Sequence, residues 1–191
     1  MSPSRHSRPG NLVRAAVMAI VFVLLAVPLW WLGWYDNYHV VIPGELYRSA
    51  QMSAPRLREH IGRDGLRAVI NLRPETNALW HTREKEASQM AGVEYVDFPL
   101  AGDRAPSSQQ TAALVIVLRR ARRPVLIHCE HGADRTSFAV ALYLSEAAGL
   151  SESQARAAFS IRYGHLAFTH VGCLDDAFAE FCRDQHSPAS H

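Results

Sequence analysis

The feature that most restricts the fold of this chain is a stretch of twenty-one residues without a charged side chain. The stretch covers residues 15–35 and lies between Arg14 and Asp36. A helix of about 20 predominantly apolar residues is long enough to cross a bilayer. The sequence therefore predicts a single transmembrane anchor at residues 15–35, preceded by a short basic segment at residues 1–14.

A cleavable signal peptide is the alternative interpretation of this stretch. A signal peptide has a shorter apolar core, of about 7 to 15 residues, followed by small residues at the cleavage site. Here the stretch ends in aromatic residues, which prefer the boundary between membrane and water: Trp30, Trp31, Trp34 and Tyr35. We therefore expect an uncleaved anchor.

The charges on either side of the predicted anchor indicate its orientation. Arg5, Arg8 and Arg14 precede the stretch, and Asp36 follows it. Because positive charge is biased towards the cytoplasmic side, we expect a single-pass protein of a bacterial inner membrane with its folded domain in the periplasm. A domain that faces the cytoplasm is the alternative.

The rest of the chain has the composition of a folded domain without a nucleic-acid partner. Hydrophobic residues make up 48% of the sequence, and three cysteines are too few for a disulfide framework. Cys173 and Cys182, on one predicted helix, are expected in the core. Without the three arginines before the anchor, seventeen basic residues stand against eighteen acidic ones. This balance lacks the excess of positive charge that nucleic-acid binding needs, and it leaves the oligomeric state open.

Short β-branched runs alternate with helical patterns over residues 37–185, which we expect to form one domain that ends in a tail at residues 186–191. The predicted strands cover His39–Ile42 and residues 66–72, 93–98 and 124–128. Predicted helices begin after capping residues, which are Ser53, Ser107 and Ser151. Strands separated by helices predict an α/β fold with a central sheet flanked by helices.

Residues 124–137, with the sequence PVLIHCEHGADRTS, carry most of the chemical information. A short apolar strand leads to His128 and Cys129, five residues follow, and Arg135 then opens a long apolar helix. Backbone N–H groups at the N-terminus of a helix form a concave anion site. The segment therefore predicts a phosphate-binding loop, formed by Glu130, His131, Gly132, Ala133, Asp134 and Arg135.

The residue types in this loop suit phosphoryl transfer. The positive field at the helix N-terminus favours the thiolate of Cys129, which is then a competent nucleophile. The planar guanidinium of Arg135 can hold two phosphoryl oxygens at once. Thr136 is placed to hydrogen-bond the sulfur, His128 is expected to orient the loop, and Gly132 allows a tight turn.

The segment HCEHGADRTS resembles the Cys-x5-Arg-Ser/Thr loop of the protein tyrosine phosphatase superfamily, on its dual-specificity side. Residues 41–52 (VIPGELYRSAQM) and 69–75 (VINLRPE) resemble segments of bacterial and fungal atypical dual-specificity phosphatases. The resemblance implies a phosphatase of phosphotyrosine or phosphoserine/threonine that works through a cysteinyl-phosphate, with no metal or organic cofactor. It also implies that Arg48 and Arg73 brace the fold or the loop.

The resemblance further implies a general acid, usually an Asp on a loop that precedes the signature. Asp103 fits best, because it lies in a loop between Pro99 and Pro106. Asp97, inside a predicted strand, and Asp134, in the phosphate loop itself, are the alternatives.

The substrate and even the activity stay open at this point. The substrate is a phosphorylated protein or a small phosphate ester, such as a nucleotide or lipid phosphate, and a phosphate-binding pseudophosphatase is a further alternative. Glu130, His131 and Asp134 make the loop acidic, which argues against highly anionic inositol lipids or polyphosphates. A rhodanese-type sulfur transferase usually has four residues in its loop, against five here. His128, Cys129 and His131 have the ligand atoms of a metal site without the geometry of a closed tetrahedral one.

Overall fold

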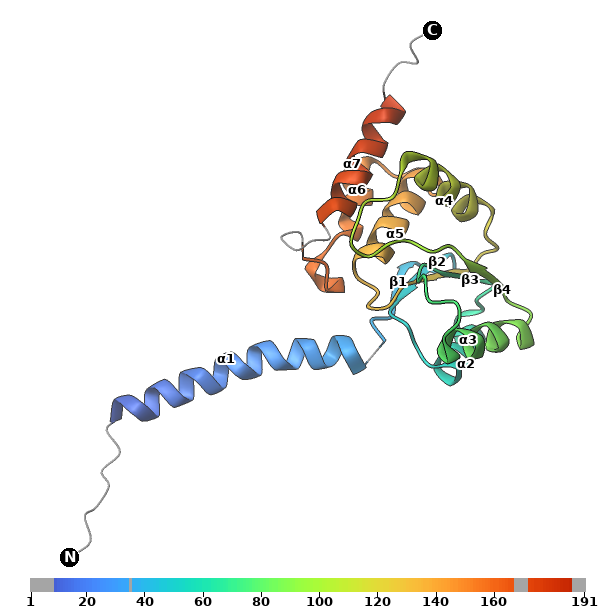
Figure 1. Ribbon diagram of the computed structural model, residues 1–191. Coiled ribbons are helices and arrows are strands. Elements are labelled where there is room, and N and C mark those ends of the chain that lie inside the picture. The colour runs from blue at the N-terminus through green and yellow to red at the C-terminus, as the bar shows by residue number, and fades with distance from the viewer. Residues whose placement is uncertain (1–8, 35, 167–171, 187–191) are drawn as a thin grey trace, which may run out of the picture. The chain divides into compact units, whose positions relative to one another are not determined.

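The computed structural model describes residues 9–34, 36–166 and 172–186 (Figure 1). The chain divides into two compact units, Met1–Tyr35 and Asp36–His191. Residues 1–8 of the predicted basic segment and residues 187–191 of the predicted tail lie outside the described residues.

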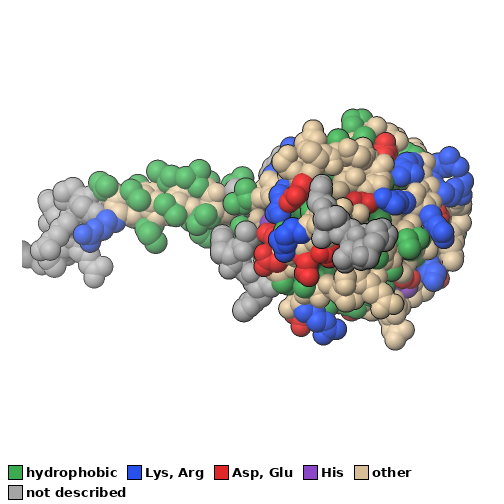
Figure 2. Space-filling view, turned by 90° about the horizontal axis from the view of Figure 1, so that it is seen from above, with side chains coloured by type: hydrophobic (Ala, Val, Ile, Leu, Met, Phe, Trp, Pro, Cys, Tyr) green, Lys and Arg blue, Asp and Glu red, His purple; other side chains and the backbone are tan. Residues whose placement is uncertain are grey.

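Helix α1 (Pro9–Trp34) belongs to the first unit. Its described side chains, at residues 13–27, are mostly exposed and hydrophobic, apart from Arg14 (Figure 2). Among the described residues, no helix has both the length and the apolar character of a bilayer crossing, which needs about 20 such residues. The transmembrane anchor predicted at residues 15–35 and the single-pass inner-membrane location are therefore wrong.

A five-stranded sheet forms the centre of the second unit, in the order β1-β2-β5-β3-β4. Its strands are β1 (His39–Ile42), β2 (Leu46–Ser49), β3 (Ala68–Asn71), β4 (Glu94–Asp97) and β5 (Val125–His128). Strand β1 is antiparallel to β2, and the other three neighbouring pairs are parallel. The predicted α/β fold with a central sheet is confirmed, although the sequence did not predict β2.

Helices cover both faces of the sheet (Figure 1). On one face lie α2 (Ala54–Asp64) and α3 (Leu79–Met90), and on the other lie α4 (Ser108–Arg120), α5 (Asp134–Glu146), α6 (Glu152–Ala155) and α7 (Gly172–His186). Two short 3-10 helices follow α6, at Arg156–Ala158 and Ile161–Tyr163. Parallel strands require crossover connections, which place helices on both faces of a sheet.

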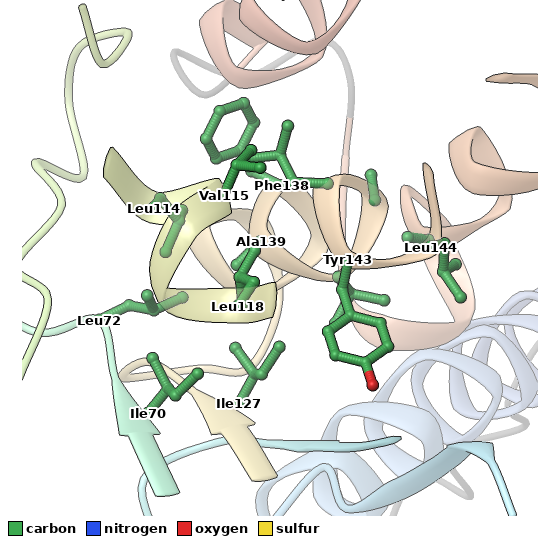
Figure 3. Close-up of a cluster of buried hydrophobic side chains, with 14 of the residues drawn as sticks. Ile70, Leu72, Leu114, Val115, Leu118, Ile127, Phe138, Ala139, Tyr143 and Leu144 are labelled. Carbon is green, nitrogen blue, oxygen red and sulfur yellow. The ribbon is translucent and has the colours of Figure 1, made fainter. Parts of the chain in front are cut away.

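Two hydrophobic clusters fill the space between the sheet and its helices. The larger cluster joins Ile127 of β5 to Leu118 of α4 and Phe138 of α5 (Figure 3). The smaller cluster packs α2 against the opposite face, through Leu57 among others. Each fully buried side chain of this kind contributes about 1.5–3 kcal/mol. Because residues 136–144 of α5 are all buried, this helix is a rigid support for the loop that precedes it.

The N-cap residues of α2, α4 and α6 are the predicted ones, Ser53, Ser107 and Ser151. The Ser107 hydroxyl accepts a hydrogen bond from the backbone N–H of Gln110 at 3.2 Å. The side chain of Gln110 then reaches past the cap and donates to the carbonyl of Pro99 at 3.0 Å. Gln110 therefore ties together the two ends of the loop that carries Asp103.

The parallel strands bring distant parts of the sequence to one edge of the sheet. The carboxyl ends of β2, β5, β3 and β4 lie at the same edge, because these strands are parallel. Strand β5 ends at His128, directly before Cys129, and its partner residue in β3 is Asn71. Arg73 follows two residues later, and the segment after β4 leads to Asp103. Candidate groups that are far apart in sequence are thus delivered to one edge of the sheet.

Candidate active site

The predicted phosphate loop lies between β5 and α5. Cys129 starts the loop and is only 2% exposed, and α5 begins at Asp134. Gly132 has a φ of +69°, and a Cβ there would lie 2.5 Å from the carbonyl carbon of Ser49 in β2. Only glycine combines this backbone conformation with so close an approach.

The first two carbonyl groups after Cys129 are held from outside the loop. The carbonyl of Glu130 accepts a hydrogen bond from the backbone N–H of Gln51 at 3.1 Å. The carbonyl of His131 accepts one from the side-chain amide of Asn37 at 2.8 Å. Both donors come from segments that flank β1 and β2, so the sheet fixes this half of the loop.

The next two carbonyl groups are held by Arg48 of β2. Its guanidinium donates to the carbonyls of Gly132 at 2.8 Å and Ala133 at 3.3 Å, and to the Ser137 hydroxyl at 2.8 Å. A further hydrogen bond of 3.0 Å reaches the carbonyl of Ala158. Arg48 is fully buried, and this burial lowers its pKa to about 10. The bracing that the resemblance implied for Arg48 thus has a definite geometry in the structure.

Because the carbonyl groups are engaged outside the loop, its N–H groups are left for an anion. None of the backbone N–H groups of residues 130–135 donates a hydrogen bond to a described residue. Unpaired N–H groups in a turn at a helix N-terminus form a concavity of positive potential, to which the helix dipole adds. The loop can therefore accept an anion such as a phosphate group.

Arg135 stands on the first turn of α5 with its side chain 11% exposed. Its guanidinium makes no hydrogen bond with the described residues, and its ion pair with Glu130 is long, at 3.6 Å between Nη2 and Oε2. A Cβ at Gly102 would lie 3.8 Å from the guanidinium carbon, so the loop that carries Asp103 passes over Arg135. This arrangement leaves a nearly buried cation available to an oxyanion.

The residue before Cys129 lies beside a buried carboxyl group that sequence reasoning missed. The Nε2 atom of His128 lies 3.2 Å from Oε1 of Glu84, and both side chains are 1% exposed. The other Glu84 oxygen accepts a hydrogen bond from the Tyr95 hydroxyl at 3.0 Å. Burial, followed by the Glu84 carboxylate, raises the pKa of Tyr95. The signal was present in α3, where polar residues recur on the buried face at intervals of three and four: His81, Glu84 and Ser88.

Thr136 lies on the first turn of α5 and is fully buried. Its hydroxyl has no hydrogen-bond partner among the described residues. An unpaired buried hydroxyl costs free energy, and here it is left free to donate to an acceptor that forms in the site.

Two of the three acid candidates are engaged elsewhere. Asp97 lies 2.8 Å from Nε2 of His81 and accepts a hydrogen bond of 2.9 Å from the Asn71 amide. Asp134 lies 2.7 Å from Nδ1 of the buried His165. By contrast, Asp103 is exposed and makes no hydrogen bond or ion pair with a described residue.

His165 joins two elements. Its Nε2 atom lies 3.0 Å from Oδ2 of Asp175 in α7, while its Nδ1 atom faces Asp134 at the start of α5. The ring is 4% exposed. His165 therefore fixes the carboxylate of Asp134 against α7.

The described residues contain no group of three His, Cys, Asp or Glu side chains that could hold a metal ion. Cys173 and Cys182 both lie in α7, where burial raises the pKa of each thiol.

Residues 43–171 match the model of a protein family described as "DSP-PTPase phosphatase fused to NAD+ kinase". The chain belongs to this family. Its matched part includes the whole phosphate loop and all three acid candidates. It is thus a phosphatase-type domain of the dual-specificity class, as the loop motif indicated.

A curated relative agrees with the second half of that family description. Over 122 residues the chain is 26% identical to the protein described as probable NAD kinase 2, chloroplastic, from Oryza sativa subsp. japonica. The match covers 58% of this chain and 12% of the relative. The chain therefore corresponds to a small part of that longer protein.

Solved structures share the fold at low identity. The core catalytic domain of the PP-IP phosphatase SIW14 from S. cerevisiae superimposes with a TM-score of 0.57 and 22% identity, covering 79% of this chain and 93% of that one. TpbA from P. aeruginosa, in complex with phosphotyrosine, has a TM-score of 0.52 and 22% identity, with coverages of 76% and 91%. These likenesses show the dual-specificity phosphatase fold.

Proposed function

We propose that this chain is a cysteine-dependent phosphatase of phosphomonoesters. The loop carries the proposal, because its carbonyl groups are held outside it and its N–H groups are unpaired with the described residues. Cys129 stands at the start of this anion site, and Arg135 stands at its end with an unused guanidinium. A nucleophile, an oxyanion cradle and a planar cation in one loop are what phosphoryl transfer to sulfur requires.

In the first step, the thiolate of Cys129 attacks the phosphorus atom of the bound ester. The S–P bond forms as the P–O bond to the leaving group breaks. The loop N–H groups and Arg135 stabilise the charge on the three phosphoryl oxygens in the transition state. Asp103 transfers its proton to the leaving oxygen, so that an alcohol or phenol departs.

In the second step, water hydrolyses the cysteinyl-phosphate. The Asp103 carboxylate takes a proton from the water, the water oxygen forms a bond to phosphorus, and the S–P bond breaks. Cys129 leaves as a thiolate, and a hydrogen bond from the Thr136 hydroxyl favours that form. Orthophosphate is released and the starting state returns.

Asp103 is the proposed acid because its loop lies close to Arg135 and because its carboxyl group is not engaged in a hydrogen bond or ion pair with a described residue. The loop that carries it passes over Arg135, as the approach of Gly102 indicates, and Asp103 makes no hydrogen bond or ion pair with a described residue. Asp97 and Asp134 would each have to leave a histidine partner first.

The proposed substrates are phosphotyrosine or phosphoserine/threonine in proteins. A second candidate is a phosphorylated nucleotide, which the family description favours, because an NAD+ kinase adds a phosphate to a dinucleotide. Initial rates with a phosphotyrosine peptide and with NADP+ at equal concentrations separate the two candidates.

Hydrolysis of p-nitrophenyl phosphate and phenyl phosphate by the full chain tests the mechanism. We expect Cys129→Ser to abolish turnover of both esters. We expect Asp103→Asn to lower kcat by about 100-fold with phenyl phosphate, and by less with p-nitrophenyl phosphate, whose leaving group needs little protonation. The matched control is Asp184→Asn, which changes another exposed aspartate, on α7. Undiminished turnover in Cys129→Ser would exclude the mechanism, and an equal loss with both esters in Asp103→Asn would exclude that residue as the acid.

A further inference from the structure

We propose that Arg73 forms a second anion-binding subsite beside the phosphate loop, for substrates that carry a second phosphate group. The carboxylate of Glu130 occupies this subsite until such a substrate displaces it. The inference rests on the proposed function, because the first phosphate of the substrate is taken to bind in the loop.

Arg73 is held in place from both its backbone and its side chain. Its backbone N–H donates to the side-chain oxygen of Asn71 at 3.0 Å, and the amide of Asn71 is itself bonded to Asp97. The guanidinium stacks over the Trp80 ring at 4.1 Å, and its Nε–H donates to Glu75 at 3.0 Å. The side chain is 12% exposed. A guanidinium fixed in this way loses little conformational freedom when it binds an anion.

Most of the hydrogen-bonding capacity of Arg73 is unused. A guanidinium has five N–H donors, and among the described residues only the Nε–H has an acceptor within hydrogen-bond distance. The Nη2 atom lies 3.9 Å from Oε1 of Glu130, which is too far for a hydrogen bond. Since the guanidinium is nearly buried, these donors are poorly supplied with water and favour an acceptor that can reach them.

Arg73 and Arg135 share one counter-ion. Glu130 lies 3.9 Å from Arg73 through one carboxylate oxygen and 3.6 Å from Arg135 through the other. Its side chain is 45% exposed, so it can turn into solvent at little cost. The field of both arginines extends further, because the pKa of Glu75 is lowered first by its hydrogen bond with Arg73 and in part by Arg135.

The position of the subsite follows from the sheet. Strands β3 and β5 are neighbours, and Asn71 is opposite His128 in their register. Arg73 and the loop therefore leave adjacent strands at the same edge. A phosphate in the loop takes the guanidinium of Arg135, and a second phosphate on the same molecule can then replace Glu130 at Arg73, where two parallel N–H groups match its oxygens.

This geometry changes what the acidic residues of the loop imply about substrates. The sequence argued against highly anionic substrates because of Glu130, His131 and Asp134. In the structure, the Asp134 carboxylate faces His165, and Glu130 lies between two arginines. The acidic side chains thus neutralise local positive charge and do not by themselves exclude a second phosphate.

Binding to the full-length Cys129→Ser protein, which cannot turn over, tests the subsite. Isothermal titration calorimetry compares adenosine 3′,5′-bisphosphate with adenosine 3′-monophosphate and adenosine 5′-monophosphate. We expect the bisphosphate to bind about tenfold more tightly than either monophosphate, as one added charge-assisted contact provides. Equal affinities would overturn the proposal.

Two substitutions in this background assign the preference to its residues. Arg73→Gln should reduce the ratio of bisphosphate to monophosphate affinity by about fivefold or more. Glu130→Gln should raise that ratio, because it removes the competing carboxylate, and misfolding cannot produce such a gain. The matched control is Arg119→Gln, which removes a carboxylate-paired arginine near the far end of α5, where it contacts Glu146.

The control should retain the ratio of the parent protein, and a ratio unchanged by Arg73→Gln would overturn the subsite. Failure of the proposed function has a different signature. In that case the wild-type chain hydrolyses neither phosphate of these nucleotides nor p-nitrophenyl phosphate, whatever the affinities of the Cys129→Ser protein.

Discussion

At the scale of single residues, the loop depends on the absence of a side chain at Gly132. We predict that Gly132→Ala lowers the free energy of unfolding by more than about 2 kcal/mol and abolishes turnover. A left-handed backbone costs an alanine about 1–2 kcal/mol, and the added Cβ would also lie 2.5–2.6 Å from backbone atoms of Ser49 and Ala50. Urea unfolding and p-nitrophenyl phosphate turnover measure the two effects.

Gly149 supplies the control for this substitution. It has the same φ of +69°, but an added Cβ would meet no atom within 4 Å. Gly149→Ala should therefore show only the conformational cost and keep its activity. If the two variants are equally stable, the close approach to β2 is not what requires glycine at position 132.

The residues of the site differ in how far the sequence could predict them. Cys129 and Arg135 belong to a contiguous motif, so the sequence is sufficient to predict that both lie in the loop between β5 and α5. Glu84 and Asn37 act on the loop from more than forty residues away in sequence. Contacts of this kind depend on strand order, which the sequence pattern alone did not determine.

At the scale of elements, four of the five strands were predicted because they contain β-branched or apolar runs. Strand β2 has the sequence LYRS, in which Arg48 interrupts the apolar pattern. All four of its residues are buried nevertheless, because the guanidinium finds its acceptors inside the fold. The arginine that braces the loop is therefore also the reason why the sequence did not predict this strand.

The contact of α5 with α7 through His165 leads to a prediction about Asp175. Asp175→Ala should lower the free energy of unfolding by about 2 kcal/mol, because it leaves one ring nitrogen of a buried histidine without its charged partner. The adjacent Asp176 is exposed on the same turn of α7 and shares the effect of the helix dipole. Asp176→Ala should change stability by no more than about 0.5 kcal/mol.

Urea unfolding of the two variants in parallel measures this difference. Equal stabilities would show that the His165 contact with α7 contributes nothing to the fold. A loss confined to Asp175→Ala, accompanied by weaker phosphate binding, would show that α7 also supports the loop through Asp134.

At the scale of the whole molecule, buried tyrosines make the fold sensitive to alkali. The hydroxyl of Tyr143 donates to Glu45 at 2.8 Å, and burial together with this hydrogen bond raises its pKa to about 12. The pKa values of Tyr38 and Tyr95 are also raised, first by burial. Unfolded tyrosine loses its proton near pH 10, whereas the folded protein retains it.

The sign of the effect follows from these protonation states. Between about pH 10 and pH 12 the folded state binds more protons than the unfolded state, so stability falls as the pH rises. We predict that Tm decreases over this range and that Tyr143→Phe makes the decrease shallower. Thermal unfolding followed by circular dichroism from pH 8 to pH 12 measures both slopes, and identical slopes would exclude Tyr143 as a contributor.

The parallel strands have a consequence for how a protein of this kind evolves. Each strand end leads to a separate part of the proposed site: β5 to the proposed nucleophile Cys129, β3 to Arg73, and β4 to the segment that contains Asp103. These parts meet in space but are encoded independently. Mutation can therefore alter substrate preference in one segment while the chemistry of the others is inherited unchanged, and grafting residues 73–80 between relatives should transfer preference without transferring catalysis.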